Sequence, residues 1–336
     1  MARLDRRRLE RLIDDFSDLH LLVIGDLVLD EYVTGEVDRV SPEAPVPVVH
    51  VRQESAMLGG AANAARNVVA LGGAVDCCSV IGDDEAGRAI RDRVKHLGID
   101  PEGLVAVPGR PTTTKTRIVA QNQQIVRFDR ETHEPPPAAA RRRLLEAIDA
   151  SIQRVDGVIV EDYGKGVLSA TIARTVMKLC GERGVPVAVD PKASLANYRG
   201  ATLLKPNLKE AEALAGIDAR NDADLARIAG RLRAKIGGGS VVVTRGGGGM
   251  SLFEGDREPL HVPTVAREVF DVAGAGDTAI AALTLALRAG ASLHEAAIIA
   301  NAASGVVVGK VGTATASADE VKALLPEALA AARGAR

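Results

Sequence analysis

The fold is decided by residues 158–189, which read VIVEDYGKGVLSATIARTVMKLCGERGVPVAV. A short apolar run at 158–160 precedes a segment over 168–182 whose apolar residues recur at helical spacing, and a second apolar run follows at 185–189. Strands that are buried on both faces are continuously apolar, and a helix between two of them lets them run parallel. The stretch therefore predicts a strand–helix–strand unit of a parallel sheet.

The same alternation continues along the chain in both directions. Further apolar runs predict strands at 21–24, 75–81, 203–204 and 241–243, and helical spacing recurs over 84–97, 141–153 and 222–236. Two regions, 31–56 and 110–130, look instead like strands without intervening helices, which is typical of a small β-sheet lid over an active site. We expect one domain over residues 1–336, an α/β fold whose mostly parallel central sheet is flanked by helices and carries this protruding lid.

The composition argues against several classes of partner. The 336 residues carry 42 basic and 44 acidic side chains, a net charge of −2, with four Phe, three Tyr and no Trp. Such a chain lacks the basic surface and the aromatic platforms of a nucleic-acid binder, so we expect no nucleic-acid partner. Its apolar stretches match neither a membrane span nor a signal peptide, and its three cysteines have no disulfide or metal-ligand spacing. We expect a cytoplasmic protein with reduced thiols and no membrane partner.

Residues 271–279, which read DVAGAGDTA, carry the sharpest candidate for chemistry. A turn through Gly274, Ala275 and Gly276 that opens a helix would point unpaired backbone N–H groups outward, beside the positive end of the helix dipole. Such a cradle suits a phosphate, and Asp277 in the first helical turn would accept a proton from a hydroxyl there. The alternative is structural, with Asp277 capping the helix and the glycines turning the chain. The pattern also mimics a dinucleotide fingerprint, but its place late in the chain disfavours a nicotinamide enzyme.

A second junction between glycines and a helix lies at 59–67, GGAANAARN. Gly59 and Gly60 would let a ligand approach the backbone, and the amide of Asn63 offers a donor and an acceptor to neighbouring hydroxyl groups. We expect Asp30 at the end of the first strand, where it would accept hydrogen bonds from sugar hydroxyls, with an ordinary turn residue as the alternative. These residues form the candidate sugar-binding side.

Two segments that follow predicted strands suit a nucleotide and its metal. Asn207 and Glu210 have the spacing of a capping box, which is a wholly structural arrangement, or would hold the water shell of Mg²⁺. Thr244, Gly246 and Gly249 would line a nucleotide with backbone amides, or would form no more than a hairpin turn. The sequence leaves both pairs of alternatives open.

Together these segments resemble the ribokinase-like (PfkB) family of sugar kinases. Gly-Gly-x-x-Asn at 59–63 and the segment 271–277 match its two signatures in order, and 207–210 and 244–249 resemble its magnesium–phosphate and nucleotide elements. The resemblance covers nearly the whole chain and implies a three-layer ribokinase-like fold that uses ATP and Mg²⁺, with a monovalent cation in some members. The nucleotide-binding residues that it implies are Asn207, Leu208, Lys209, Glu210, Thr244, Gly246, Gly249 and Asn301, with Glu210 and Asn207 holding the metal through water.

Further segments resemble the branch of this family that phosphorylates heptose 7-phosphates. They read RVSPEAPVP at 39–47, TKTR at 114–117 and DYGKG at 162–166. The likeness implies ATP-dependent phosphorylation of the anomeric C1 hydroxyl of D-glycero-β-D-manno-heptose 7-phosphate, giving the 1,7-bisphosphate for ADP-heptose and the lipopolysaccharide core. Many such kinases carry a nucleotidyltransferase domain with a His-x-Gly-His motif, which this sequence lacks, so we expect a kinase alone. The alternatives are another sugar or nucleoside kinase, ribokinase- or fructokinase-like, and a non-catalytic sugar-phosphate sensor.

A sugar that already bears a phosphate requires cations away from the reacting hydroxyl. The cationic side chains expected on lid strands or at strand ends are Lys115, Arg117, Arg127, Lys165 and Lys192. Lys165 and Arg117 are the first choices for the phosphate contact, with a plain surface charge as the alternative for each. Pairing with a second copy would cover the exposed strand edges of the lid, so we expect a homodimer through the lid.

Overall fold

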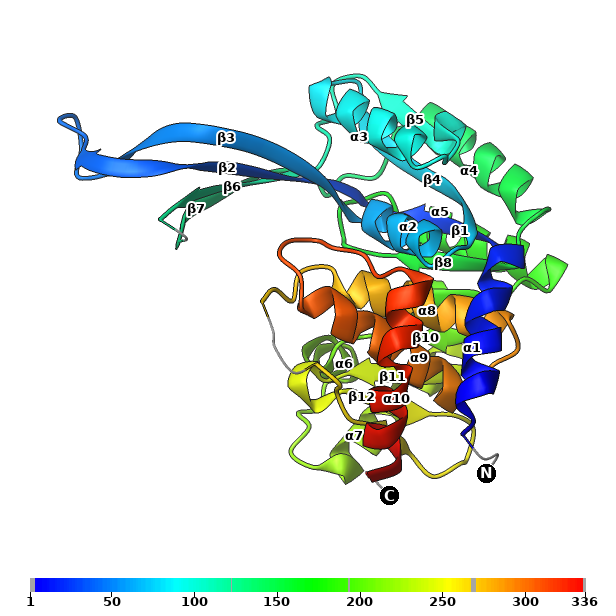
Figure 1. The fold of residues 1–336 in the computed structure, drawn as a ribbon. Helices are drawn as coiled ribbons and strands as arrows, with labels where there is room; N and C mark the ends of the chain where they lie inside the picture. The colour runs from blue at the N-terminus through cyan, green and yellow to red at the C-terminus, as the bar shows by residue number, and fades with distance from the viewer. Residues whose placement is uncertain (1–3, 122, 193, 267–269, 335–336) are drawn as a thin grey trace.

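The central element of the structure, a computed structural model that describes residues 4–121, 123–192, 194–266 and 270–334, is a nine-stranded sheet. Its strand order is β13-β12-β11-β10-β9-β8-β1-β4-β5, with helices on both faces (Figure 1). Neighbouring strands are parallel from β11 to β5, whereas β12 and β13 run antiparallel at one edge. The strands are β1 (His20–Gly25), β4 (Ala74–Gly82), β5 (Leu104–Val107), β8 (Gly157–Glu161), β9 (Val187–Asp190), β10 (Leu203–Leu204), β11 (Ser240–Thr244), β12 (Met250–Phe253) and β13 (Leu260–Val262).

Each apolar run that was predicted to be a strand forms one, and the mostly parallel α/β sheet is confirmed. The quoted unit becomes β8, α5 and β9, with β8 and β9 parallel as predicted. Strands β5, β12 and β13 were not predicted. They are short and lie at or next to the edges of the sheet, where a strand carries a weaker apolar signal than one buried on both faces.

Two hydrophobic cores lie on opposite faces of the sheet because side chains alternate along each strand. Leu21 and Val23 of β1 point into one core, and Leu22 and Ile24 point into the other. The helices of the first face are α1 (Arg6–Asp14), α2 (Ala61–Ala70), α3 (Glu85–His96), α8 (Ala275–Arg288), α9 (Leu293–Val308) and α10 (Ala318–Gly334). Those of the second are α4 (Ala138–Ile152), α5 (Ala170–Arg183), α6 (Leu208–Ala215) and α7 (Asp222–Ile236).

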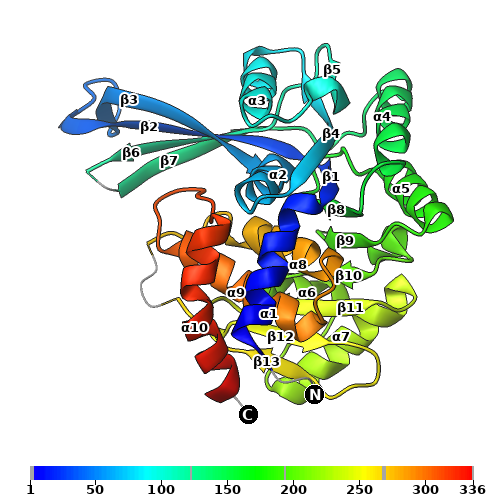
Figure 2. The ribbon, with the colours of Figure 1, turned by 45° about the vertical axis from the view of Figure 1, so that its right-hand side comes forward.

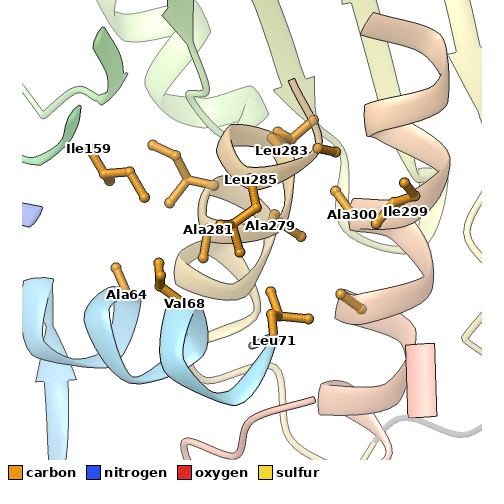
Figure 3. Close-up of a cluster of buried hydrophobic side chains, with 14 of the residues drawn as sticks. Ala64, Val68, Leu71, Ile159, Ala279, Ala281, Leu283, Leu285, Ile299 and Ala300 are labelled. Carbon is orange, nitrogen blue, oxygen red and sulfur yellow. The ribbon is translucent and has the colours of Figure 1, made fainter. Parts of the chain in front are cut away.

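Helix α8 is buried between α2 and α9, and this position fixes its N-terminus at the sheet (Figure 3). Alanines such as Ala279 and Ala281 are fully buried there, and their small side chains let the neighbouring helices approach closely. The Ala-rich segments therefore form buried helices. Among the described residues, no helix combines the length and the apolarity needed to cross a membrane.

The predicted lid is a separate four-stranded sheet of order β3-β2-β6-β7 that projects from one end of the central sheet (Figures 1 and 2). It consists of β2 (Leu27–Val40), β3 (Pro47–Gly60), β6 (Thr114–Ala120) and β7 (Gln123–Arg130). The pairs β2–β3 and β6–β7 are antiparallel, and β2 and β6 run parallel. Both predicted lid regions are confirmed as strands without crossover helices, and the first pair extends further toward the central sheet than predicted.

The position predicted for Asp30 is wrong. The first strand ends at Gly25, and after the single residue Asp26 the chain enters β2, so that Asp30 lies within a lid strand. The carboxylate of buried Asp26 binds backbone N–H groups of the β8–α5 loop, which fixes the point where the chain passes from the central sheet to the lid. Asp30 is thereby carried onto the lid, opposite Met57 of β3.

Candidate active site

A cavity of about 590 Å³ opens where strands β8 to β11 end and α8 begins. This is the carboxyl edge of the parallel strands, the usual ligand-binding edge of an open α/β sheet. The predicted residues that line it are Lys192, Asn207, Glu210, Thr244, Gly246, Gly249, Gly274, Ala275, Gly276, Asp277 and Asn301. Leu208 and Lys209 do not line it, since Leu208 packs against the second core and Lys209 is exposed to solvent.

Helix α8 presents free amides to this cavity, as the glycine-rich turn predicts. Gly274 is its N-cap residue, in the left-handed region with φ +79°, and no side chain caps the helix. The N–H of Ala275 donates to Val272 O at 3.3 Å, and the first bond to a carbonyl four residues back is donated by Thr278 to Gly274 O at 3.0 Å. The intervening amides, of Gly276 and Asp277, therefore remain available to a phosphate.

Asp277 lies in the first turn of α8 with its side chain buried and lining the cavity. The hydroxyl of Tyr163 donates to its Oδ1 at 2.6 Å, and the Nδ2 of Asn63 donates to its Oδ2 at 2.6 Å. Burial raises the pKa of Asp277, and the two hydrogen bonds and the ammonium of Lys205 act against that rise. The structure thus brings Asn63 and Asp277 together from two separate sequence segments.

The side chain of Asn63 is itself held in one orientation. Its Oδ1 accepts from Arg66 Nη2 at 2.8 Å, which leaves its amide nitrogen facing Asp277. The same arginine donates to the carbonyl of Thr313, and Asn67 Nδ2 donates to Asn63 O at 2.9 Å. A Cβ at Gly274 would lie 2.5 Å from Asn63 Nδ2, so this position requires glycine for space as well as for φ.

A row of ionisable side chains at the ends of β8, β9 and β10 was not predicted. Lys205 is almost fully buried and its Nζ lies 2.7 Å from Asp190 Oδ2. Burial raises the pKa of Asp190 to about 6, although Lys205 opposes the shift. Glu161 is also buried, both of its carboxylate oxygens lack a hydrogen-bond partner among the described residues, and burial raises its pKa well above the usual value. A polar residue that ends an apolar strand was the signal available in the sequence.

The capping-box interpretation of Asn207 and Glu210 is confirmed. Asn207 Oδ1 accepts from the N–H of Glu210, and Glu210 Oε2 accepts from the N–H of Asn207, both at 3.0 Å. Both side chains also line the cavity, and Glu210 Oε1 lies 3.2 Å from Lys192 Nζ. Within the described residues, no group of three or more His, Cys, Asp or Glu side chains gathers as direct ligands of a metal.

The predicted glycine segment at 244–249 connects the antiparallel strands β11 and β12. It forms a tight turn in which the N–H of Arg245 donates to Gly249 O at 2.8 Å, so the hairpin interpretation is confirmed. Thr244, Gly246 and Gly249 nevertheless face the cavity, and so does Asn301 of α9, whose Nδ2 donates to Pro263 O at 2.7 Å.

The lid carries an ion pair, Arg117 and Asp30, beside the predicted sugar-binding glycines. Arg117 Nη1 lies 2.6 Å from Asp30 Oδ1, with both side chains largely buried. A Cβ at Gly59 would lie 2.1 Å from Asp30 Oδ2, so only glycine allows the carboxylate its place. Gly60 is the N-cap of α2, and it joins the lid to the helix that carries Asn63.

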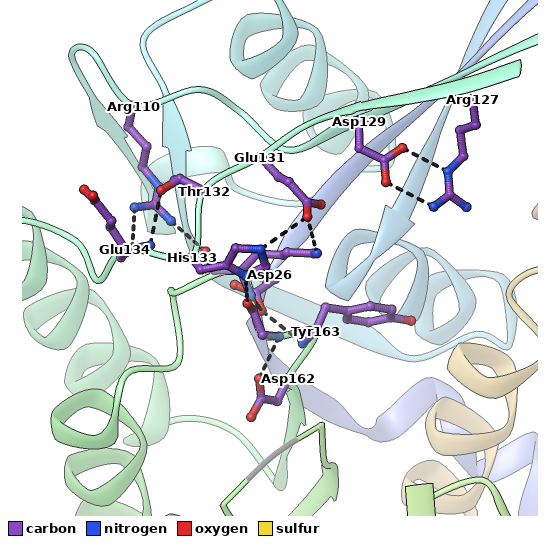
Figure 4. Close-up of polar contacts among 12 residues, drawn as sticks. Asp26, Arg110, Arg127, Asp129, Glu131, Thr132, His133, Glu134, Asp162 and Tyr163 are labelled. Carbon is purple, nitrogen blue, oxygen red and sulfur yellow. Dashed lines mark hydrogen bonds and ion pairs between the residues drawn. The ribbon is translucent and has the colours of Figure 1, made fainter. Parts of the chain in front are cut away.

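Most of the other predicted phosphate-binding cations are paired with carboxylates. Lys165 Nζ lies 2.7 Å from Glu131 Oε1, and Arg127 Nε lies 2.9 Å from Asp129 Oδ1 on the same strand (Figure 4). Lys115 has no carboxylate partner in the described part of the chain, and its Nζ lies over the ring of Tyr163, 6.0 Å from the centroid. Lys192 lies apart from the lid cations, beside Glu210 on the cavity wall.

Comparisons with known proteins define the class as carbohydrate kinase. A family model described as pfkB family carbohydrate kinase matches residues 19–320. The chain belongs to this family and is a sugar kinase. Among curated relatives, the Bifunctional protein HldE of Geobacter metallireducens is 47% identical over 319 residues, covering 95% of this chain and 65% of that protein. The protein of the same name from Trichlorobacter lovleyi is 46% identical with the same coverage. The chain thus spans about two thirds of the length of these relatives, 65%.

Solved structures show the same ribokinase-like fold at low sequence identity. Arabidopsis thaliana ribokinase, solved with ribose and ATP, has a TM-score of 0.73 at 21% identity and covers 91% of this chain and 98% of its own. Escherichia coli phosphofructokinase-2 in complex with potassium has a TM-score of 0.74 at 20% identity, covering 92% and 98%. The expected fold class and family are confirmed.

Proposed function

We propose that this chain uses ATP to phosphorylate the anomeric C1 hydroxyl of D-glycero-β-D-manno-heptose 7-phosphate, giving the 1,7-bisphosphate. The observation that carries the proposal is the buried carboxylate of Asp277, which lines the cavity beside the free amides of α8. The choice of sugar is supported by the segments at 39–47, 114–117 and 162–166. A role in ADP-heptose and lipopolysaccharide core synthesis is part of the same proposal.

Asp277 is the proposed general base. The O–H bond of the C1 hydroxyl breaks and its proton passes to a carboxylate oxygen of Asp277. The freed oxygen forms a bond to the γ-phosphorus of ATP while the bond between that phosphorus and the bridging oxygen breaks, and ADP leaves with the electron pair. The amides at 274–276, of which only that of Ala275 has a hydrogen bond within the described chain, and the amide of Asp277 stabilise the charge on the transferring group.

Mg²⁺ is the proposed companion of ATP, and the residues present fit it through water. Asn207 and Glu210 line the cavity, and each of their capping oxygens accepts one hydrogen bond and keeps a second lone pair for a metal-bound water. When bound, Mg²⁺ supplies positive charge to the phosphates. Thr244, Gly246, Gly249 and Asn301 are proposed to line the nucleotide, and Lys192, beside Glu210, is better placed for its phosphates than for the sugar.

The sugar is proposed to bind between the lid and α2. Asp30 and Asn63 would bind its hydroxyl groups, with Gly59 leaving room for the Asp30 carboxylate and Gly60 leading the chain from the lid into α2. For the 7-phosphate we propose Lys115 first, because within the described chain no carboxylate is paired with it. Arg117 and Lys165 come next, because each is paired with a carboxylate. Arg127, exposed and paired with Asp129, completes the proposed group.

A homodimer through the lid is a further part of the proposal. The exposed large apolar side chains of the lid region are Val40, Val46, Val51, Ile125, Val126 and Phe128. The outer strands β3 and β7 also leave unpaired edges. Pairing with a second copy would cover both the apolar side chains and the edges.

The decisive experiment compares ribose, fructose 6-phosphate and heptose 7-phosphate as acceptors, with ADP release as the readout and phosphorus NMR to locate the new phosphate. We expect heptose 7-phosphate to have the highest kcat/KM and to be phosphorylated at C1. Preference for another sugar would overturn the substrate, and no ADP release with any of them would favour the sensor. Asp277→Asn should lower kcat by about 10²–10⁴ while ATP still binds, as expected for loss of a general base.

Asp84 offers a matched control for Asp277→Asn. Its carboxylate accepts from Thr112 Oγ1 at 2.6 Å and from the N–H of Gly87 at 2.8 Å at the start of α3, and it does not line the cavity. Asp84→Asn makes the same chemical change and should lower stability without lowering kcat. An Asp277→Asn enzyme that keeps more than about a tenth of the activity would remove Asp277 from the base role.

A further inference from the structure

The loop between β8 and α5, residues 162–167, carries a side chain that contacts the proposed base. Tyr163 reaches across from this loop and donates its hydroxyl hydrogen to Asp277 Oδ1 at 2.6 Å. Burial and the charge of Asp277 raise the pKa of Tyr163 well above its usual value, so the phenol keeps its proton and acts only as a donor. It therefore restrains the carboxylate without competing for the substrate proton.

The backbone of this loop is bound to the start of β2. Asp26 lies beside Tyr163 (Figure 4), and its Oδ2 accepts from the N–H groups of Tyr163 and Lys165, both at 3.0 Å. Its Oδ1 accepts from the N–H of Val167 at 3.1 Å. Asp26 is buried, so these charge-assisted hydrogen bonds are shielded from water. They fix the path of the chain on both sides of Tyr163.

Both connections of the lid hairpin β6–β7 hold the same loop. Before β6, Arg110 Nη2 donates to Lys165 O at 2.8 Å. After β7, Glu131 Oε1 lies 2.7 Å from Lys165 Nζ, and His133 Nδ1 lies 2.6 Å from Gly164 O. From the hairpin itself, the ammonium of Lys115 lies over the ring of Tyr163. A displacement of the lid must therefore strain or break contacts of the loop that carries Tyr163.

We propose that Tyr163 is a positioning residue for Asp277, and that the 162–167 loop transmits the position of the lid to the base. The proposal rests on the proposed function, since it takes Asp277 as the base. Tyr163 and Asn63 restrain one oxygen each, so the carboxylate cannot rotate, and its remaining lone pairs stay directed at one place in the cavity. Lid closure over a sugar and alignment of the base then occur together.

The test replaces only the hydroxyl, with Tyr163→Phe. Because a hydrogen bond to a charged group is worth about 1.5–3 kcal/mol, we expect kcat to fall at least about 10-fold. The acidic limb of the pH profile of kcat/KM should move to higher pH, because the lost donor no longer favours the ionised carboxylate. The KM for ATP should stay within about two-fold, since the hydroxyl contributes to alignment of the base rather than to uniform binding.

The other ionisable groups that act on Asp277 stay unchanged in this variant. They are Asp30 of β2, Arg66 of α2, Glu161 of β8, Asp190 of β9 and Lys205 after β10. Tyr198→Phe is the matched control, because the Tyr198 hydroxyl also donates at 2.6 Å to a carboxylate, but to Asp162 Oδ2 and not to Asp277. Tyr198→Phe should lower the free energy of unfolding and leave the acidic limb of the pH profile of kcat/KM unchanged.

The outcomes separate this proposal from the proposed function. If Asp277→Asn is inactive and Tyr163→Phe keeps the wild-type kcat and acidic limb, Tyr163 does not position the base and the inference is wrong. If Tyr198→Phe moves the acidic limb as far as Tyr163→Phe, the hydroxyl contact with Asp277 is not what restrains the base, and the positioning role of Tyr163 is overturned. If Asp277→Asn is active, the base assignment itself fails.

Discussion

Replacing Gly59 by alanine tests the sugar-binding side of the site. Gly59 lies on β3 opposite Val28 of β2, and an added Cβ would lie 2.1 Å from Asp30 Oδ2. Outside Asp30, the side-chain atom nearest to the added Cβ is Val28 Cβ at 3.4 Å, which is close to an ordinary van der Waals contact. The carboxylate of Asp30 must therefore move, and its 2.6 Å contact with Arg117 must lengthen or break.

Two effects contribute to the expected magnitude. Forcing an extra methyl group into a packed site costs about 1–3 kcal/mol of the free energy of unfolding. Loss of a hydrogen bond between charged groups that are largely buried costs a similar amount, about 1.5–3 kcal/mol. The carboxylate can relieve the clash by moving away from Arg117, so the variant has either one cost or the other and not both in full. We therefore expect the free energy of unfolding to fall by about 1–3 kcal/mol. A loss of the same size in the free energy of sugar binding should raise the KM for the sugar about 10-fold or more, since 1.4 kcal/mol corresponds to a factor of ten.

The assay is a double-mutant cycle with Asp30→Ala, read by denaturant unfolding and by the KM for the sugar. In the Gly59→Ala, Asp30→Ala double variant the clash is absent. The double variant should therefore lose less free energy of unfolding than the two single variants lose together. The KM should stay as high as in Asp30→Ala alone, because the carboxylate is missing in both. Additive stability effects, or a Gly59→Ala enzyme with wild-type stability and KM, would refute the steric argument.

Two other changes test the buried charges and the lid. Lys205→Met should lower the free energy of unfolding by about 3–5 kcal/mol, because it leaves Asp190 buried without its partner, and Asp190→Asn in the same chain should restore part of that loss in a denaturant titration. Phe128→Glu on the lid should shift the sedimentation coefficient from dimer to monomer at micromolar protein, whereas Phe270→Glu, which is equally apolar, more exposed and off the lid, should leave it unchanged. Equal behaviour of the two Phe variants would contradict assembly through the lid.

The sequence predicts the central fold well because its strands are buried on both faces. A run such as 21–24 is continuously apolar, and β1 sends Leu21 into one core and Leu22 into the other. The signal fails at the edges. Strand β12 contains Ser251, whose buried hydroxyl binds the His261 ring on β13 at 2.8 Å and accepts from Arg245 Nη1 at 3.2 Å, so its polar group finds these partners only in the folded sheet. A sequence pattern does not contain that pairing.

The site is predictable where its residues are contiguous and less so where the fold assembles them. Residues 274–277 turn the chain, open α8 and face the cavity within one short segment, so local rules suffice. Tyr163 contacts Asp277, and Asp190 and Lys205 act on its charge, because β8, β9 and β10 are adjacent in the sheet. Each lies at the end of an apolar strand or within two residues of it, which predicts the edge of the sheet that the residue occupies, but its partner depends on strand order.

The charges of the cavity wall also bear on why ATP would need a divalent cation there. Among the described residues that line it, the carboxylates are Asp162, Asp190, Glu210 and Asp277, and the ammonium groups are Lys192 and Lys205. Lys205 is buried and paired with Asp190, so it cannot turn to a phosphate without leaving a buried carboxylate unpaired, whereas the half-exposed Lys192 can exchange Glu210 for a phosphate. The helix N-terminus offers only partial charge. A triphosphate would thus enter a cavity with little free positive charge, which the Mg²⁺ proposed to bind through water near Asn207 and Glu210 would supply.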